Sequence, residues 1–163
     1  MNIIIKKREL IYKGNKIKCS IGKSGITGRK KEGDLATPRG IFKLGKIYFR
    51  KDRISLPKCK LPAKIIKKNM GWSDDVLSKK YNQELSNRLQ HKSEKLYRQD
   101  RLYDVFINIK YNCNPIVKKK GSAIFLHLCN KNYKPTKGCV AVQKNDMLKI
   151  LPLITKKTKI IIK

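Results

Sequence analysis

Two stretches near the C-terminal end, G-S-A-I-F-L-H-L at residues 121–128 and K-P-T-K-G-C-V-A-V at residues 134–142, decide the fold of this sequence. Each contains a short apolar run of the kind that forms a β-strand. Side chains alternate between the two faces of a strand, so every second residue of each run faces the same side. If the two strands are neighbours, the imidazole of His127 and the thiol of Cys139 reach the same space within hydrogen-bonding distance.

Similar runs recur along the chain and predict a mainly β fold, with strands at residues 2–6, 16–21, 41–49, 104–110, 123–128, 139–142 and 159–163. Helical signals are weaker. Asn145 is expected to cap a short helix at 146–151, which Pro152 helps to end, and residues 85–99 allow a second one. The polar, irregular middle from about residue 51 to 100 is interpreted as an insertion on the sheet.

The length of 163 residues, 40% of them apolar, suits a single domain over residues 1–163 with its own core. The formal net charge of +30 has two interpretations. One is a polyanion-binding module, for nucleic acid or an anionic surface. The other is compositional bias, because the lysines are scattered and outnumber arginine, whereas nucleic-acid surfaces recruit Arg and aromatic residues. The second is favoured, so no specific nucleic-acid partner is expected.

The cysteines indicate at least one free thiol and neither a disulfide framework nor a zinc site, since their number is odd and no C-x-x-C pair occurs among positions 19, 59, 113, 129 and 139. The chain has only two histidines, His91 and His127, which further weakens a zinc site. His91 stands in a polar context typical of the surface. We therefore expect no metal.

Cys139 and His127 suit a nucleophile and its base. A protonated thiol is weakly nucleophilic, and an adjacent imidazole can convert it to a thiolate. Gly138 lets a substrate approach the backbone, and the N–H groups of Gly138 and Cys139 can receive the oxyanion of an acyl-transfer intermediate. The alternative is a buried structural cysteine with a histidine nearby by chance, because cysteine is among the most buried residue types.

The pattern H…P-T-K-G-C-V, from His127 to Val140, resembles the active-site signature of the bacterial L,D-transpeptidases, the YkuD-like family. Four further stretches are similar to a compact subgroup of that family, in the same order along the chain: K-K-E-G-D-L-A-T-P-R-G-I-F at 30–42, G-W-S-D-D at 71–75, Y-R-Q-D-R-L-Y-D at 97–104 and G-S-A-I-F-L-H at 121–127. The resemblance implies a single β-sandwich or open barrel with one or two short helices.

The resemblance also implies a chemistry. Cys139 would attack a peptide bond of a peptidoglycan stem tetrapeptide and form a thioester, and His127 would take the thiol proton. Gly138 would shape the turn and the oxyanion site, and Thr136 stands where the family has Ser or Thr. The terminal D-alanine would leave, and an amine of a neighbouring stem peptide would complete the cross-link without a cofactor.

Two positions depart from the family pattern, which has Gly directly after the His and Arg two residues after the Cys. Leu128 and Ala141 stand there instead. The missing cation is expected to be replaced at the substrate by Lys134, Lys137 or Arg98. The same site would act as an L,D-carboxypeptidase if water were the acceptor, and a family member that binds stem peptides without turnover is a further alternative.

Trp72 and the aspartates that follow it, Asp74 and Asp75, are candidates for a rim over the substrate groove, although core packing and turn capping explain them equally well. We expect a monomer that binds peptidoglycan stem peptides. The substrate indicates the periplasm or cell envelope. No secretory h-region of about 7–15 apolar residues and no membrane span of about 18 is visible, so the cytoplasm is the alternative.

Overall fold

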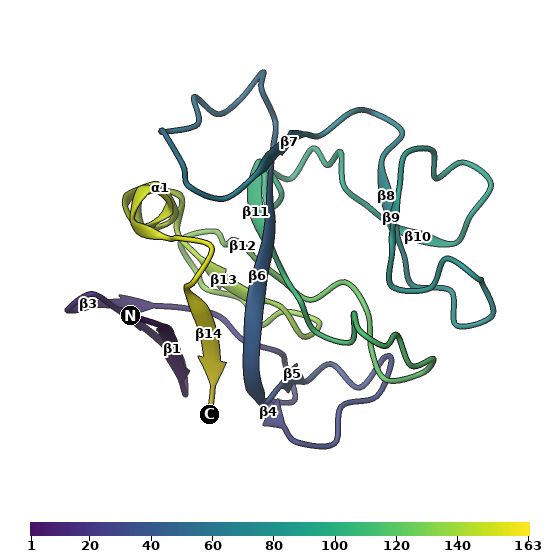
Figure 1. The fold of residues 1–163 in the computed structure, drawn as a ribbon, viewed down its shortest axis with the longest axis horizontal. Coiled ribbons are helices and arrows are strands. Elements are labelled where there is room, and N and C mark those ends of the chain that lie inside the picture. Colours follow the sequence, from purple (N-terminus) through teal and green to yellow (C-terminus); the bar gives the residue numbers. More distant parts are fainter.

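Strand β6 (Gly40–Phe49) is the longest strand of the computed structural model, which describes residues 1–163 (Figure 1). Its run G-I-F-K-L-G-K-I-Y-F contains many β-branched and aromatic residues, which favour a pleated strand. One edge of β6 pairs with β11 (Val105–Ile109). The other edge pairs first with β14 (Lys159–Ile162) and then with β7 (Ala63–Ile65). β6 therefore connects β11 on one side of the sheet with β14 and β7 on the other.

The main sheet has nine strands, and its two ends approach each other. Its remaining members are β1 (Ile3–Lys6), β2 (Glu9–Tyr12), β3 (Asn15–Lys18), β12 (Phe125–Leu128) and β13 (Val140–Val142). The order is β13-β12-β11-β6-β14-β1-β2-β3, with β7 beside β6. Just after β3, Ser20 exchanges two backbone hydrogen bonds, of 2.7 and 2.9 Å, with Ala141 of β13. This bridge nearly closes the sheet into a barrel.

The two faces of β12 and β13 pack into different apolar clusters. Leu126, Leu128, Val140 and Val142 belong to an aliphatic core that also receives the helix α1 (Lys144–Ile150). Phe125 and Cys139 belong instead to a mainly aromatic cluster on the opposite face. This division confirms the alternation expected from the sequence, and it directs the candidate thiol away from the barrel interior.

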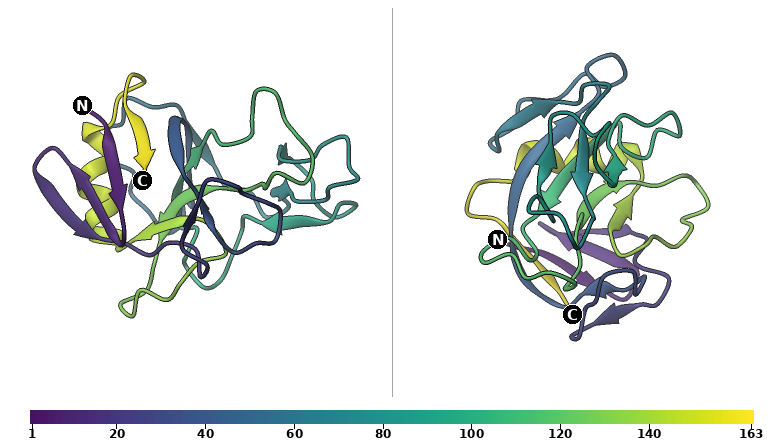
Figure 2. Two further views of the ribbon diagram at one scale, coloured as in Figure 1. Left: turned by 90° about the horizontal axis from the view of Figure 1, so that it is seen from below. Right: turned by 90° about the vertical axis from the view of Figure 1, so that its right-hand side faces the viewer.

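The central insertion carries a small sheet of its own, with β8 (Gly71–Ser73) between β9 (Glu84–Leu85) and β10 (Ser93–Lys95). It lies at the end of the molecule away from the chain termini (Figure 2). The aromatic cluster joins this insertion to the main sheet, since it combines Trp72 and Leu96 with Phe106 and Phe125. A third, two-stranded sheet pairs β4 (Ile26–Thr27) with β5 (Thr37–Pro38).

The mainly β fold, the seven predicted strands and the short C-terminal helix are confirmed, whereas the helix considered for residues 85–99 is wrong. Leu85 and Leu96 are buried, but Leu89 is 70% exposed, so this segment has no continuous apolar face. The cap is also wrong, because Gln143 precedes α1 and Asn145 lies within the helix. A 3₁₀ turn, η1 (Leu151–Leu153), follows α1 directly. The sequence reasoning missed β2 and the short strands β4, β5 and β7 to β10.

Candidate active site

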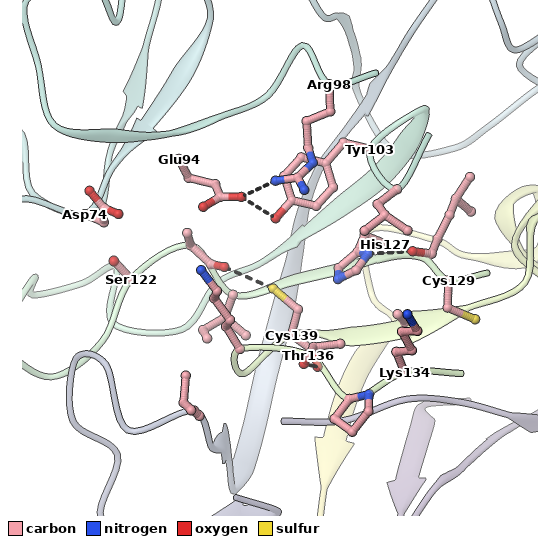
Figure 3. A pocket seen from close by; sticks show the side chains of 18 of the residues that line it. Asp74, Glu94, Arg98, Tyr103, Ser122, His127, Cys129, Lys134, Thr136 and Cys139 are labelled. Carbon is pink, nitrogen blue, oxygen red and sulfur yellow. Dashed lines mark hydrogen bonds and ion pairs between the residues drawn. The ribbon is translucent and has the colours of Figure 1, made fainter. Parts of the chain in front are cut away.

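A pocket of about 530 Å³ lies where β12, the start of β13 and the insertion meet. His127 of β12 and Cys139, which directly precedes the parallel neighbour β13, both line it (Figure 3). One wall comes from the insertion and the segment after it, including Glu94, Arg98 and Tyr103. The opposite side comes from the loop between β12 and β13. The pocket therefore brings together the two residues on which the sequence interpretation depends.

His127 is held by its own strand. Its Nδ1 lies 2.7 Å from the carbonyl oxygen of Leu128. Because a carbonyl oxygen only accepts hydrogen bonds, Nδ1 carries the proton and Nε2 keeps a lone pair in the neutral ring. The Nε2 side of the ring faces Cys139 (Figure 3), and Tyr103 packs edge-on against the ring at 5.2 Å. The ring is therefore oriented as a proton acceptor.

Burial lowers the pKa of His127 from 6.5 to about 4, although the carbonyl groups of Leu128 and Leu102 oppose this shift. Burial raises the pKa of the Cys139 thiol to about 12. Both effects have the same origin, because a poorly hydrated environment disfavours the charged form of each group. The pair is therefore a neutral imidazole and a neutral thiol near pH 7. Formation of the thiolate must be coupled to the approach of a substrate.

Cys139 does not form the direct hydrogen bond with His127 that the sequence led us to expect. Its Sγ donates to the carbonyl oxygen of Ala123 at 3.2 Å and accepts from the N–H of Phe125 at 3.3 Å. The strand register explains the difference, because Ala141 and not Cys139 is paired with His127. The thiol must leave Ala123 to transfer its proton to Nε2.

The loop before Cys139 is organised by Thr136. Its hydroxyl donates to the carbonyl oxygen of Cys139 at 2.6 Å and accepts from the N–H of Gly138 at 3.1 Å. The N–H of Gly138, expected at the oxyanion, is therefore occupied. The N–H of Cys139 donates no backbone hydrogen bond in this loop. This N–H group is therefore available to an incoming oxygen. Gly138 has φ +136°, and a Cβ there would lie 2.8 Å from the Ala36 carbonyl oxygen.

The upstream T-P-R-G segment supports the same loop. The hydroxyl of Thr37 accepts a 2.8 Å hydrogen bond from the buried N–H of Gly22. Gly22 forms a parallel bridge with Thr136, and the N–H of Thr136 donates to the carbonyl oxygen of Ile21 at 2.9 Å. A Cβ on Gly22 would lie 2.3 Å from the Leu35 carbonyl oxygen, so only glycine fits. Two distant sequence motifs thus meet behind the candidate nucleophile.

Among the residues expected to bind substrate, the two lysines and Arg98 reach the pocket. Lys134 and Lys137 line the pocket, are exposed and form no ion pair. Arg98 also lines it, but Asp100 and Glu94 already neutralise its guanidinium, and hydrogen bonding to Asp100 raises its pKa.

Trp72 does not reach the pocket. It is 5% exposed, donates its indole N–H to Asn82, and packs edge-on against Phe125 at 5.2 Å. Core packing therefore explains it better than the rim interpretation. Asp74 does line the pocket, whereas Asp75 accepts a hydrogen bond from the N–H of Leu77 in a turn.

Sequence reasoning missed several polar residues of the pocket wall, namely Glu32, Glu94, Tyr103 and Ser122. The available signal was their position inside the quoted motifs at 30–42, 97–104 and 121–127, since Glu32, Tyr103 and Ser122 each belong to one of them. No group of three or more His, Cys, Asp or Glu side chains suited to a metal ion occurs in the structure.

The buried imidazole predicts a pH-dependent stability. The unfolded chain protonates His127 near pH 6.5 and the folded protein only near pH 4, so the unfolded chain binds more protons in this window. Acidification from pH 6.5 to 4 should therefore remove about 3 kcal/mol of the free energy of unfolding. We expect His127→Asn to lack this loss in urea unfolding at both pH values. Equal pH dependence of the two proteins would contradict the assignment.

The nearly closed sheet and a cysteine and a histidine in one pocket define a β-fold thiol site. A family model of the L,D-transpeptidase catalytic domain, YkuD, matches residues 2–162, and the chain belongs to this family. Members are generally cysteine-dependent transpeptidases that act on peptidoglycan peptides, which associates the family with the cell envelope. No curated protein matches the sequence. None of the helices in the structure is long and apolar enough to span a membrane.

Proposed function

We propose that this chain is a peptidoglycan L,D-transpeptidase that cross-links stem peptides in cell-wall biogenesis through a thioester on Cys139, with His127 as the base. One observation carries the proposal: the thiol and the Nε2 side of the imidazole face the same pocket, beside an unused backbone N–H. The membership of the chain in the family supports the substrate class.

In the first step, Sγ of Cys139 attacks the carbonyl carbon that precedes the terminal D-alanine of a stem tetrapeptide. The thiol proton passes to Nε2 of His127, and the carbonyl oxygen becomes an oxyanion that the N–H of Cys139 stabilises. When the tetrahedral intermediate collapses, the C–N bond breaks and the imidazolium gives its proton to the leaving D-alanine amine. A thioester on Cys139 remains.

In the second step, an amine of a neighbouring stem peptide attacks the thioester. His127 takes a proton from this amine, the C–S bond breaks, and the proton returns to Sγ. The products are a new peptide bond and the free thiol, so the cycle needs no cofactor. Water in place of the amine would give the carboxypeptidase outcome.

The surrounding residues receive separate roles. Gly138 and Thr136 hold the turn that presents the Cys139 N–H, and the positive φ and the hydroxyl contacts described above support this role. Lys134 and Lys137 are unpaired cations at the rim suited to substrate carboxylates, in place of the arginine that Ala141 replaces. Arg98 orders Glu94 and Tyr103 at the pocket wall.

We further propose that residues 1–163 act as one catalytic domain and as a monomer in the cell envelope, without a nucleic-acid partner. The pairing of β1 with β14 supports the first point, since it ties both ends of the chain into one sheet. His127 and Cys139 lie in the same pocket, so the proposed chemistry needs no catalytic residue from a second copy, which supports the second.

The test is incubation of the protein with purified disaccharide tetrapeptides, followed by mass analysis of the protein and of the products. We expect an adduct on Cys139 that has lost D-alanine, and cross-linked dimers among the products. Free tripeptide without dimers would replace the transpeptidase with the carboxypeptidase. Absence of both the adduct and any product would overturn the proposal.

A further inference from the structure

The pocket wall is unusually acidic for so basic a chain. The protein has 41 Lys and Arg residues but only 11 Asp and Glu residues, and three of these carboxylates, Glu32, Asp74 and Glu94, line the pocket. Glu94 is paired with Arg98. Glu32 and Asp74 form no ion pair, although cations outnumber acids throughout the chain. Two carboxylates thus face the site of chemistry without a counter-ion.

Glu32 is held in place by neutral donors. Its Oε2 accepts hydrogen bonds from the hydroxyl of Tyr81 at 2.5 Å and from Ser122 at 2.7 Å. The hydroxyl of Tyr81 in turn accepts a hydrogen bond from the N–H of Gly121 at 3.0 Å. These contacts fix the side chain but leave its charge unneutralised, and Oε1 makes no hydrogen bond. An ordered carboxylate with a free oxygen is suited to a cationic ligand.

Asp74 has a more strained environment. Its Oδ1 is buried and has no hydrogen-bond partner. Burial raises the pKa of Asp74 and the negative charge of Glu32 adds to this shift, whereas the backbone N–H of Asp74 and the exposed Lys92 offset it only in part. Two carboxylates that repel each other in a partly dehydrated wall are destabilising as they stand. A cation placed between them would remove the repulsion and restore a favourable electrostatic environment.

The pocket is therefore polarised. Asp74 and Ser122 lie on one side of Cys139 and Lys134 on the other (Figure 3). A substrate residue that carries both a carboxylate and a free amine would match this arrangement, with its carboxylate at the lysines and its ammonium group at the acidic wall. An ammonium group has three donors, which suits two carboxylates and the hydroxyl of Ser122.

We propose that Glu32 and Asp74 form the recognition site for the side-chain ammonium group of a diamino residue in the stem peptide. This inference rests on the proposed function for the identity of the peptide. The ammonium group belongs to the donor peptide if it is recognised before the thioester forms, and to the acceptor peptide if it is recognised afterwards. The two steps can be measured separately.

The probes are three synthetic tetrapeptides that differ at the third residue, which is lysine, Nε-acetyl-lysine or norleucine. We expect wild-type protein to be acylated by the lysine peptide roughly tenfold to a hundredfold more efficiently than by the other two, in kcat/KM measured without an acceptor. If acylation shows no preference but transfer to an added lysine-containing acceptor does, the wall serves the acceptor. Absence of a preference in both steps overturns the inference.

The matched variants are Glu32→Gln and Asp74→Asn, with Asp75→Asn as the control, because Asp75 is adjacent but outside the pocket. The double variant should lose the preference for the free amine, so that the ratio of kcat/KM between the lysine and acetyl-lysine peptides falls to about one. Asp75→Asn should behave as wild type. A double variant that melts as wild type does and still prefers the free amine would refute the assignment.

A binding measurement without turnover tests the inference separately from the catalytic proposal. Calorimetry with Cys139→Ala compares the dissociation constants of the lysine and acetyl-lysine peptides without turnover. A preference for lysine that disappears in Glu32→Gln/Asp74→Asn supports the ammonium site, even if no peptide acylates the wild-type protein. Equal binding of both peptides argues against it, whatever the catalytic result.

Discussion

Replacing Cys139 with serine is expected to reduce acyl-enzyme formation by at least about a thousandfold while leaving the fold intact. A hydroxyl is far harder to deprotonate than a thiol, and serine enzymes compensate with a carboxylate that stabilises the imidazolium. His127 has no such partner, because its Nδ1 bonds the carbonyl oxygen of Leu128. Serine can keep the contacts with Phe125 and Ala123, so the melting temperature should change little.

Intact-protein mass spectrometry after incubation with a stem tetrapeptide measures this effect. Cys129→Ser is the matched control, since Cys129 lines the same pocket but its sulfur points away from Cys139 (Figure 3). Burial raises the pKa of Cys129 to about 11, so it is an unreactive thiol in the free protein. If Cys139→Ser were acylated at the wild-type rate, or if the adduct were on Cys129, the nucleophile would be wrongly assigned.

The second large effect is expected for His127→Asn, with a loss of about a hundredfold to ten-thousandfold in the rate of acylation. The asparagine amide can still donate to the Leu128 carbonyl oxygen in place of Nδ1–H, so the strand and loop keep their anchor. Nothing in the variant replaces Nε2 as the acceptor of the thiol proton. The expected defect is therefore chemical and not structural.

The pH profile distinguishes these two origins. Because the imidazole becomes protonated only near pH 4, the wild-type acylation rate should stay level at neutral pH and fall as the pH drops through about 4. In His127→Asn the rate should instead rise with pH toward the thiol pKa of about 12, because only the thiolate fraction reacts. Parallel profiles for the two proteins would rule out His127 as the base.

The strands that carry this site, and the faces on which their side chains lie, can be predicted from local sequence patterns. Alternation in A-I-F-L-H-L and G-C-V-A-V correctly assigns Phe125 and Cys139 to one face and Leu126 and Val140 to the other. The order of the motifs indicates the family, which the match over residues 2–162 shows. These features depend on residues close in sequence, and the physical rule of side-chain alternation is sufficient for them.

Features set by long-range packing could not be predicted in the same way. The strand register places Ala141 beside His127 and sends the thiol to Ala123, and no local pattern specifies that register. The burial of Trp72 depends on where the insertion docks. The insertion itself is built from strands of two or three residues, which are too short to show a periodicity.

The placement of β14 in the sheet has a consequence for biosynthesis. This late segment, Lys159–Ile162, lies between β6 and β1 and supplies the ladder that joins the first three strands to β6. The bridge between Ser20 and Ala141 is the second link between the first three strands and the rest of the sheet. The link between β6 and β1 is therefore completed only when translation has passed this segment, so the main sheet reaches its full strand order late in synthesis.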